Sequence, residues 1–268
     1  MEVMYTLSYL FMIFFLTSLM GYICEVIYCS IVDHYFEWNR GFLFGPYVPI
    51  YGVGTLLIIG LSKKYFNDPI ALFWLTVITC SLVEYFASWI MEKLFKVRWW
   101  NYSTQKFNVN GRICLLNSFL FGFGGLLIIY VLYPFFQKIL VLIPQNITIG
   151  IALVCATIFV IDFIVTVVTL ISIKITIEDI ENSNYKSTDE TELVRAKAIE
   201  RIKENVTFYN PILKAFPSID GVKKDSFKQF RVLVEGVKKT IAAGGKVVDN
   251  TRGKVVEKTQ SLRKMVKK

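Results

Sequence analysis

The chain has 268 residues, of which 54% are hydrophobic, and its formal net charge is +9 at pH 7. An ordinary water-soluble domain of this length has much less apolar surface to hide, so composition excludes that class. Long apolar runs are followed by a charged, lysine-rich segment. We therefore predict a transmembrane helix bundle over residues 1–173 and a basic cytoplasmic tail over residues 174–268.

Apolar runs predict five membrane spans, because crossing about 30 Å of hydrocarbon takes roughly 20 helical residues. The first run lacks a basic start and a cleavage site, so we expect it to be a span and not a signal peptide. The predicted fold class is all-α, a polytopic bundle with a Gly/Pro-interrupted second span and a helical tail. The spans are at about Tyr5–Cys29, Pro49–Leu61 with an apolar lead-in from Gly41, Ile70–Ile90, Ile113–Phe136 and Ile147–Ile173.

The basic residues of the short loops favour one orientation, since Lys and Arg gather in cytoplasmic loops. With the tail inside, five spans place the N-terminus outside. The cytoplasmic loops then hold about six basic residues and the outer loops about three: Arg40, Lys93, Lys96, Arg98, Lys106 and Arg112 against Lys63, Lys64 and Lys138.

The tail carries about 21 basic and about 13 acidic residues. Apolar residues recur every three or four positions from Phe227 to Met265, a heptad seam that predicts an amphipathic helix. Two interpretations stay open: the helix lies on anionic lipid headgroups, or it docks on a partner helix as a coiled coil. No nucleic-acid-binding motif accompanies the charge, so we do not expect nucleic acid as a partner.

Three ionisable residues, Glu25, Glu84 and Asp162, fall inside predicted spans, where such residues are costly and usually functional. Each lies on a stripe of small or polar residues at helical spacing, which predicts that it faces the bundle interior. On the third predicted span the stripe is Thr76, Cys80, Glu84, Ser88 and Glu92. Arg40 and Arg112 precede the spans that run back from the cytoplasm, so both can reach the depth of the two glutamates. The cluster is either a set of packing ion pairs or a site for a solute, ion or proton.

The segment from Asn39 to Gly54 has the highest density of Gly and Pro in a predicted span. Pro46 and Pro49 remove backbone donors, and irregular backbone at membrane depth must be buried in protein or line a cavity. The segment is either a re-entrant element, with Pro49 in the first turn of the following helix, or a tight interhelical turn. With one histidine, His34, and no CxxC pair, we expect no metal site and no cofactor.

This segment resembles part of a bacterial family of putative ABC-transporter permeases, type IV. The resemblance covers about residues 10–135 and includes Gly21…Glu25, Glu84…Glu92, Trp99-Trp100-Asn101-Tyr102-Ser103 and Phe107–Leu115. It implies a transport role in a bacterial plasma membrane. The family reads Trp-Trp-Asp-Tyr-Ser, so Asn101 removes an acid there. The candidate substrate-binding residues are Glu25, Arg40, Glu84, Trp100, Asn108, Arg112 and Asp162.

No GxxxxGK[ST] motif occurs in the sequence, so this chain is not an ATPase, and a permease of this kind needs a separate ATPase subunit. We identify no catalytic residues. The sequence favours a transport-associated, permease-like subunit in the lipid bilayer. The alternatives are a non-catalytic membrane scaffold or regulator that recruits partners through its tail, and a membrane-embedded enzyme acting on a lipid-like substrate.

Overall fold

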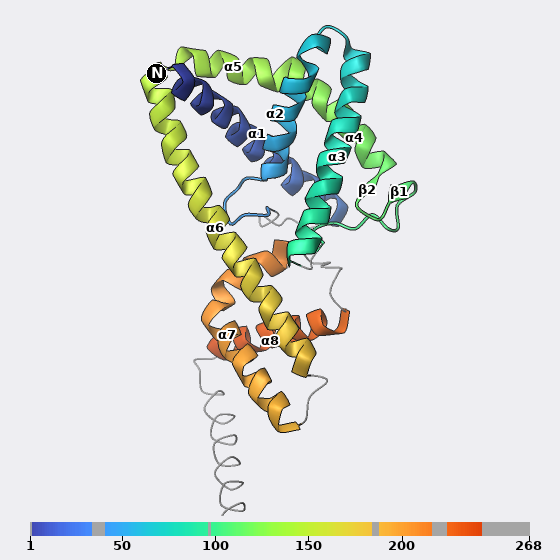
Figure 1. Ribbon diagram of the computed structural model, residues 1–268, viewed down its shortest axis with the longest axis vertical. Helices are drawn as coiled ribbons and strands as arrows, with labels where there is room; N and C mark the ends of the chain where they lie inside the picture. Colours follow the sequence, from blue (N-terminus) through green and yellow to red (C-terminus); the bar gives the residue numbers. More distant parts are fainter. Residues whose placement is uncertain (1, 34–40, 96–97, 184–187, 216–223, 243–268) are drawn as a thin grey trace, which may run out of the picture. The chain divides into compact units, whose positions relative to one another are not determined.

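The computed structural model describes residues 2–33, 41–95, 98–183, 188–215 and 224–242. Almost all of them are helical, which confirms the all-α class (Figure 1). The helices divide into two compact units. The membrane unit comprises Met1–Ile171 and Pro211–Val222, and the tail unit comprises Ser172–Asn210 and Lys223–Lys268.

Four helices of the described residues are long and apolar enough to cross a membrane, and a fifth is shorter. The short one, α2, has 14 residues and so spans about 21 Å, less than the hydrocarbon thickness of about 30 Å. It begins at Pro49, as predicted. The helices are α1 (Glu2–Asp33), α2 (Pro49–Ser62) with the 3₁₀ turn η1 (Lys63–Tyr65), α3 (Pro69–Phe95), α4 (Leu115–Leu127), the π-helical η2 (Ile128–Leu132), α5 (Tyr133–Leu142) and α6 (Gln145–Ser183).

Segments α4, η2 and α5 form one uninterrupted apolar helix, Leu115–Leu142. Pro134 lies at the start of α5, and a proline inside a helix cannot donate the usual bond to the carbonyl four residues earlier. The π-helical turn directly before it is the local adjustment that such a break requires. The predicted fourth span is therefore present, with a change of helical pitch in its middle.

Small residues let neighbouring helices of the membrane unit approach closely. A Cβ atom on Gly52 of α2 would collide with the Phe14 ring of α1, and one on Gly125 of α4 would collide with the Thr76 side chain of α3. A hydrophobic cluster joins α1, α5 and α6 at the opposite end of α1 from Asp33: Met12, Ile13, Phe136, Leu140 and Ala152. These contacts hold the helices at the separations that bring their polar faces together.

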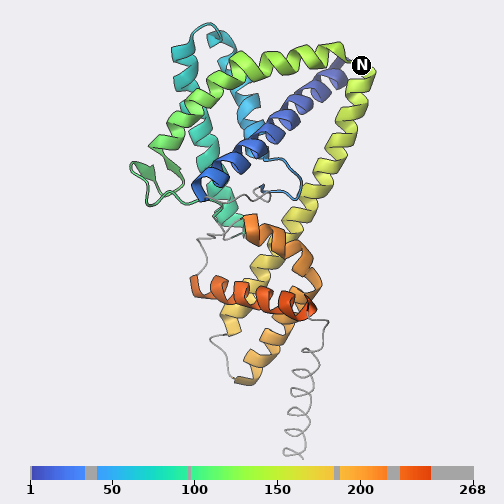
Figure 2. The same ribbon diagram turned by 180° about the vertical axis from the view of Figure 1, so that it is seen from behind.

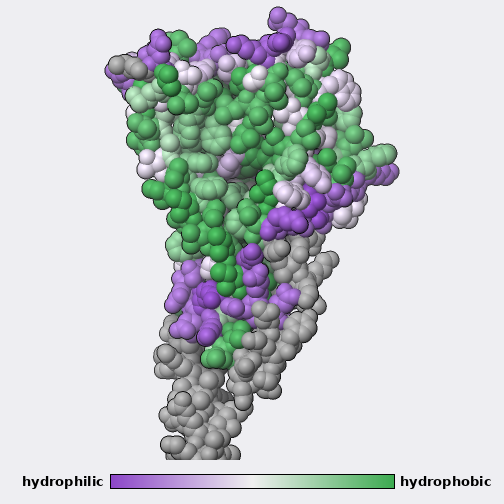
Figure 3. All heavy atoms as spheres, in the orientation of Figure 1, coloured by the Kyte–Doolittle hydropathy of each residue, from purple (hydrophilic) through white to green (hydrophobic). Residues whose placement is uncertain are grey.

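The outer surface of the membrane unit is hydrophobic. Figure 3 shows apolar side chains over most of one face and hydrophilic residues at its two ends. Many large apolar side chains are exposed, among them Trp74, Phe123 and Ile161. Such a surface suits lipid, in which apolar contact is not penalised, and the chain is a multi-pass membrane protein.

A short hairpin follows α3, with β1 (Asn108–Val109) paired antiparallel with β2 (Ile113–Cys114). Its turn has two left-handed residues, Asn110 (φ 53°) and Gly111 (φ 68°). Asparagine and glycine are the residue types that adopt this conformation most readily, so the Asn-Gly pair explains the turn. The hairpin leads directly into α4.

The tail unit is built from the end of α6, helix α7 (Thr188–Ala215) up to Asn210, and helix α8 (Lys224–Ala242). Tyr209 is fully buried, packs at a tilt against Phe230 with ring centroids 5.7 Å apart, and shares a 2.6 Å hydrogen bond with Ser172. An ion pair between Arg201 and Asp179, 2.7 Å apart, links α7 to α6. The unit therefore has a core of its own.

The predicted apolar seam of the tail is partly used inside this unit. Phe227, Phe230, Val234 and Val237 of α8 are all at most 7% exposed, whereas Ile241 is 52% exposed. These four positions pack internally and so are not open to a lipid surface or to a separate helix. The rest of the seam, from Gly244 to Met265, lies outside the described residues, so a coiled coil there stays a prediction.

Candidate functional site

The carboxyl group of Asp162 on α6 holds the Gly/Pro segment. It accepts hydrogen bonds from the backbone N–H groups of Phe44 (3.0 Å) and Gly45 (2.7 Å) and from the hydroxyl of Tyr47 (2.6 Å). Thr166, one turn further along α6, donates a fourth at 3.2 Å. Both carboxylate oxygens thus have donors, which compensates the partly buried negative charge for the water it has lost. We call this set the Asp162 latch.

The latched segment lies beside the middle of α1, a helix long and apolar enough to cross a membrane. The N–H group of Val48 donates to the carbonyl oxygen of Ser18, 3.0 Å away, near the midpoint of α1. Helix α2 begins at the next residue, and both views show residues 41–48 between α1 and α6 (Figures 1 and 2). Of the two interpretations of the sequence, this position favours a re-entrant element over a tight turn at the membrane surface.

Two glutamates inside the bundle are each bound by a tyrosine. The Tyr51 hydroxyl donates to Oε1 of Glu25 at 2.7 Å, and the Tyr102 hydroxyl donates to Oε1 of Glu84 at 3.0 Å. Burial and then the nearby Glu84 carboxylate raise the pKa of Tyr102 well above its ordinary value, and the Glu25 charge acts in the same direction. Tyr102 therefore stays protonated as a donor, and both glutamates lie within electrostatic reach of one phenol. We call these four residues the Glu–Tyr cluster.

Glu84 belongs to a polar face of α3 that the structure buries. Thr76 is 0% exposed, Glu84 5% and Ser88 2%, and their spacing of four residues and multiples of four places them on one face of the helix. The Thr76 Oγ1, Glu84 Oε2 and Ser88 Oγ atoms have no hydrogen-bond partner among the residues described. Sequence spacing predicted the face but not these unpartnered atoms.

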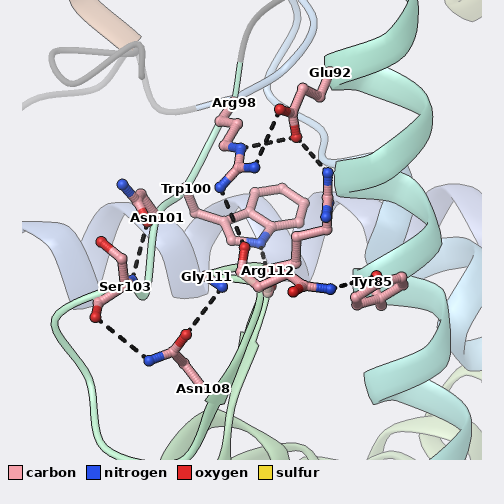
Figure 4. Close-up of polar contacts among 10 residues, drawn as sticks. Tyr85, Glu92, Arg98, Trp100, Asn101, Ser103, Asn108, Gly111 and Arg112 are labelled. Carbon is pink, nitrogen blue, oxygen red and sulfur yellow. Dashed lines mark hydrogen bonds and ion pairs between the residues drawn. The ribbon is translucent and has the colours of Figure 1, made fainter. Parts of the chain in front are cut away.

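A second polar group lies at the end of α3 (Figure 4). Glu92 accepts from Arg98 through both oxygens, at 2.8 and 3.1 Å, and its Oε2 is 2.5 Å from Nη2 of Arg112. The Trp100 indole donates to the backbone carbonyl of Arg112 at 2.8 Å, and the Arg112 guanidinium lies over the Tyr85 ring. We call this set the Glu92 ion cluster; it ties the hairpin loop to α3.

Asparagine side chains hold the loop of the hairpin. Asn108 donates to the Ser103 carbonyl at 3.4 Å and accepts from the Gly111 N–H at 3.0 Å, while Asn101 accepts from the Ser103 N–H at 3.0 Å (Figure 4). Asn108 also donates to the Gln105 carbonyl at 2.8 Å. An aspartate at position 101, the family's usual residue, would supply the same acceptor. The Asn101 difference therefore preserves the turn contact, and an acidic function at this position is not required for it.

The structure distributes the predicted site residues over three places. Glu25 and Glu84 meet in the Glu–Tyr cluster, Asp162 forms the latch, and Trp100, Asn108 and Arg112 belong to the loop beside the Glu92 ion cluster. Arg40 lies outside the described residues. The sequence suggested that Arg112 lies near Glu25 or Glu84. In the structure it pairs with Glu92 instead, because the hairpin brings it to the end of α3.

Several contributing residues were not selected from the sequence as site residues, above all Tyr47, Tyr51 and Tyr102. The chain has 14 tyrosines, and a tyrosine in an apolar segment carries no signal of the carboxylate that its hydroxyl will meet. Tyr51 and Tyr102 lie in the segments quoted for the family resemblance, and this was the one sequence signal that could have marked them as site residues. Glu92 shared the predicted polar face of α3, but its partner Arg98 had no distinguishing pattern.

Comparison with protein families decides the classification. The family described as putative ABC-transporter type IV matches residues 12–167, more than half of the chain and nearly all of the polar residues above. The chain belongs to this family. No curated protein and no solved structure matches it. The match confirms the resemblance drawn from the sequence and ends before the tail unit.

Proposed function

We propose that this chain is the membrane-spanning, permease-like subunit of a transporter and that a separate ATPase subunit supplies the energy. The family match and the four long apolar helices support a transport-associated membrane protein. The chain's own sequence contains no phosphate-binding loop of the GxxxxGK[ST] type. ATP hydrolysis must then come from a partner chain.

One observation carries this proposal: the Asp162 latch holds irregular backbone beside the middle of two candidate membrane spans, α1 and α6. Transporters place substrate sites at helices that are interrupted near the bilayer midplane, where unwound backbone and helix ends face the solute. Residues 41–48 followed by the short α2 have this arrangement, with contacts to Asp162 and Ser18. We propose that the segment and the nearby carboxyl groups line the transport path.

The orientation follows from charge. We propose that the N-terminus faces outward and the tail faces the cytoplasm of a bacterial cell, because the predicted inner loops carry about twice as many basic residues as the outer ones. An ATPase subunit would then dock on the cytoplasmic side, where ATP is present. The hairpin with the Glu92 ion cluster and the tail unit would face it.

The test is purification of the tagged full chain from native membranes. We expect an ATPase subunit to co-purify and its ATP hydrolysis to depend on the chain. The Asp162→Asn variant should keep the partner but reduce hydrolysis at least several-fold, since it weakens the latch. Glu2→Gln, an exposed carboxylate of α1, is the matched control and should change nothing. A preparation that contains no ATPase would contradict the proposal.

A non-catalytic scaffold or regulator is the second candidate, and one observation favours it. The pocket beside the Gly/Pro segment, lined by Tyr22 and residues 41–45, has a volume of only about 20 Å³, enough for one water molecule. A scaffold needs no path through the bundle. For that function, truncation of the tail should abolish partner binding while Asp162→Asn leaves the partner's activity unchanged.

A further inference from the structure

Glu84 and Asp162 have opposite surroundings. Among the described residues, the Asp162 carboxylate accepts four hydrogen bonds, whereas Glu84 accepts one, from Tyr102, and its buried Oε2 atom has no partner there. Glu84 also makes no ion pair with the part of the chain that the structure describes. Burial with so few hydrogen-bond donors disfavours the ionised carboxylate and favours the neutral carboxylic acid.

The other polar groups near Glu84 come from several elements. Those in direct interaction with it are Glu25 of α1, Cys80 of α3 and Tyr102 of the hairpin loop. One step further out, Tyr51 of α2 bonds to Glu25, and the uncharged amide of Asn117 on α4 bonds to Tyr102. The titratable groups among these are all acids, so none brings a positive charge. Arg98 and Arg112, the arginines of the hairpin loop, are already bound by Glu92 two turns along α3.

Buried hydroxyls beside Glu84 form a second, independent observation. Ser88 lies one turn from Glu84 on the same face of α3, is 2% exposed, and its Oγ has no partner among the described residues. Thr76 on that face and Thr55 of α2 are in the same condition. Buried polar atoms are nearly always hydrogen-bonded, so a row of unpartnered hydroxyls indicates groups that bind water or pass a proton in the working protein.

No group of three metal-binding side chains occurs within the described residues, and the pattern fits a proton better than a metal ion. We propose that Glu84 is a proton-binding site of the transport path, taking up a proton at Oε2 and releasing it during the transport cycle. The step is the addition of H⁺ to the carboxylate and its loss from the acid. Tyr102 donates to the other oxygen in both states. This role deepens the proposed transport function and rests on it.

The test is infrared spectroscopy of the full chain in lipid nanodiscs at pH 7, without any ATPase. Exposed Asp and Glu are ionised there, because their ordinary pKa values are near 4. We expect the carbonyl band of one protonated carboxylic acid in the natural chain. Glu84→Gln should abolish that band. Glu2→Gln, with an exposed carboxylate, and Asp162→Asn, with a well-bonded one, should both retain it.

Tyr102→Phe provides a second reading that does not require loss of Glu84. It removes the hydrogen bond to Oε1, so the band should remain but shift in frequency; this result suffices if Glu84→Gln fails to fold. A natural chain without the band, a band that survives Glu84→Gln, or one that Tyr102→Phe does not shift would overturn the assignment to Glu84. None of these outcomes depends on an ATPase, so the proton site and the proposed transport function can fail separately.

Discussion

Arg112 could pair with Glu92 or with Glu84, and the two pairings predict different effects of mutation on stability. Its guanidinium contacts Glu92 and the Tyr85 ring, and the side chain is only 11% exposed. Sequence position alone allowed a pair with Glu84 instead. When two residues interact, the stability losses from mutating each of them do not add; when they do not interact, the losses add. A double-mutant cycle therefore separates the two possibilities.

We expect Glu92→Gln to lower the free energy of unfolding by about 1–3 kcal/mol, because two arginines lose a charged acceptor. The losses from Glu92→Gln and Arg112→Ala should overlap when combined, whereas those from Glu84→Gln and Arg112→Ala should add. Denaturant unfolding of the purified protein in detergent measures both cycles. Additivity in the first cycle would show that the pair is not coupled.

At the scale of elements, two adjacent glycines of α4 differ in their surroundings. A Cβ atom on Gly125 would collide with Thr76 of α3, while one on Gly124 would meet nothing within 4 Å. The close approach of α3 and α4 is what buries the polar face that carries Glu84. Helix packing therefore requires glycine at position 125, whereas at position 124 only helix propensity matters, and it favours alanine.

Gly124→Ala should leave stability unchanged or raise it by up to about 1 kcal/mol, because alanine is the better helix former. Gly125→Ala should lower it by about 1–3 kcal/mol, because the added methyl group overpacks the interface. Thermal unfolding of both variants in the same detergent provides the comparison. Equal effects at the two positions would mean that α3 and α4 are not in close contact at Gly125.

Helix α8 offers a similar contrast between its faces. Phe230 is fully buried in the tail unit, and Val232 is 65% exposed. Phe230→Ala should cost about 3–5 kcal/mol and open the tail unit to proteases, whereas Val232→Ala should have little effect. Limited proteolysis of the full chain measures this. Equal digestion of the two variants would indicate that the seam is not a core and is free for lipid or a partner.

At the scale of the whole molecule, orientation is tested by labelling single cysteines, in a background without the five native ones, with a membrane-impermeant thiol reagent. A cysteine at Asn67, exposed in the turn between η1 and α3, should react in intact cells. One at Lys268 should react only after lysis, because the basic loops predict a cytoplasmic tail. Labelling of position 268 in sealed cells would reverse the orientation.

Local sequence properties determined much of this fold. Hydropathy predicted the four long apolar helices of the membrane unit, because the bilayer requires a long apolar run for every crossing, and it also marked the shorter α2. Pro49 marked the start of α2, and the spacing of Thr76, Glu84 and Ser88 predicted the buried face of α3, since each of these signals lies within one element. Motifs quoted from the sequence were enough to identify the family.

Only the tertiary structure decided which polar groups meet. Asp162 binds Gly45 and Tyr47 across more than a hundred residues of chain, and Arg112 reaches Glu92 because a hairpin turns it there. A periodic pattern gives the face on which a side chain lies but not the neighbour it meets. That neighbour depends on close packing between elements distant in sequence, and in a membrane, where apolar faces find lipid equally acceptable, small residues and hydrogen bonds decide it.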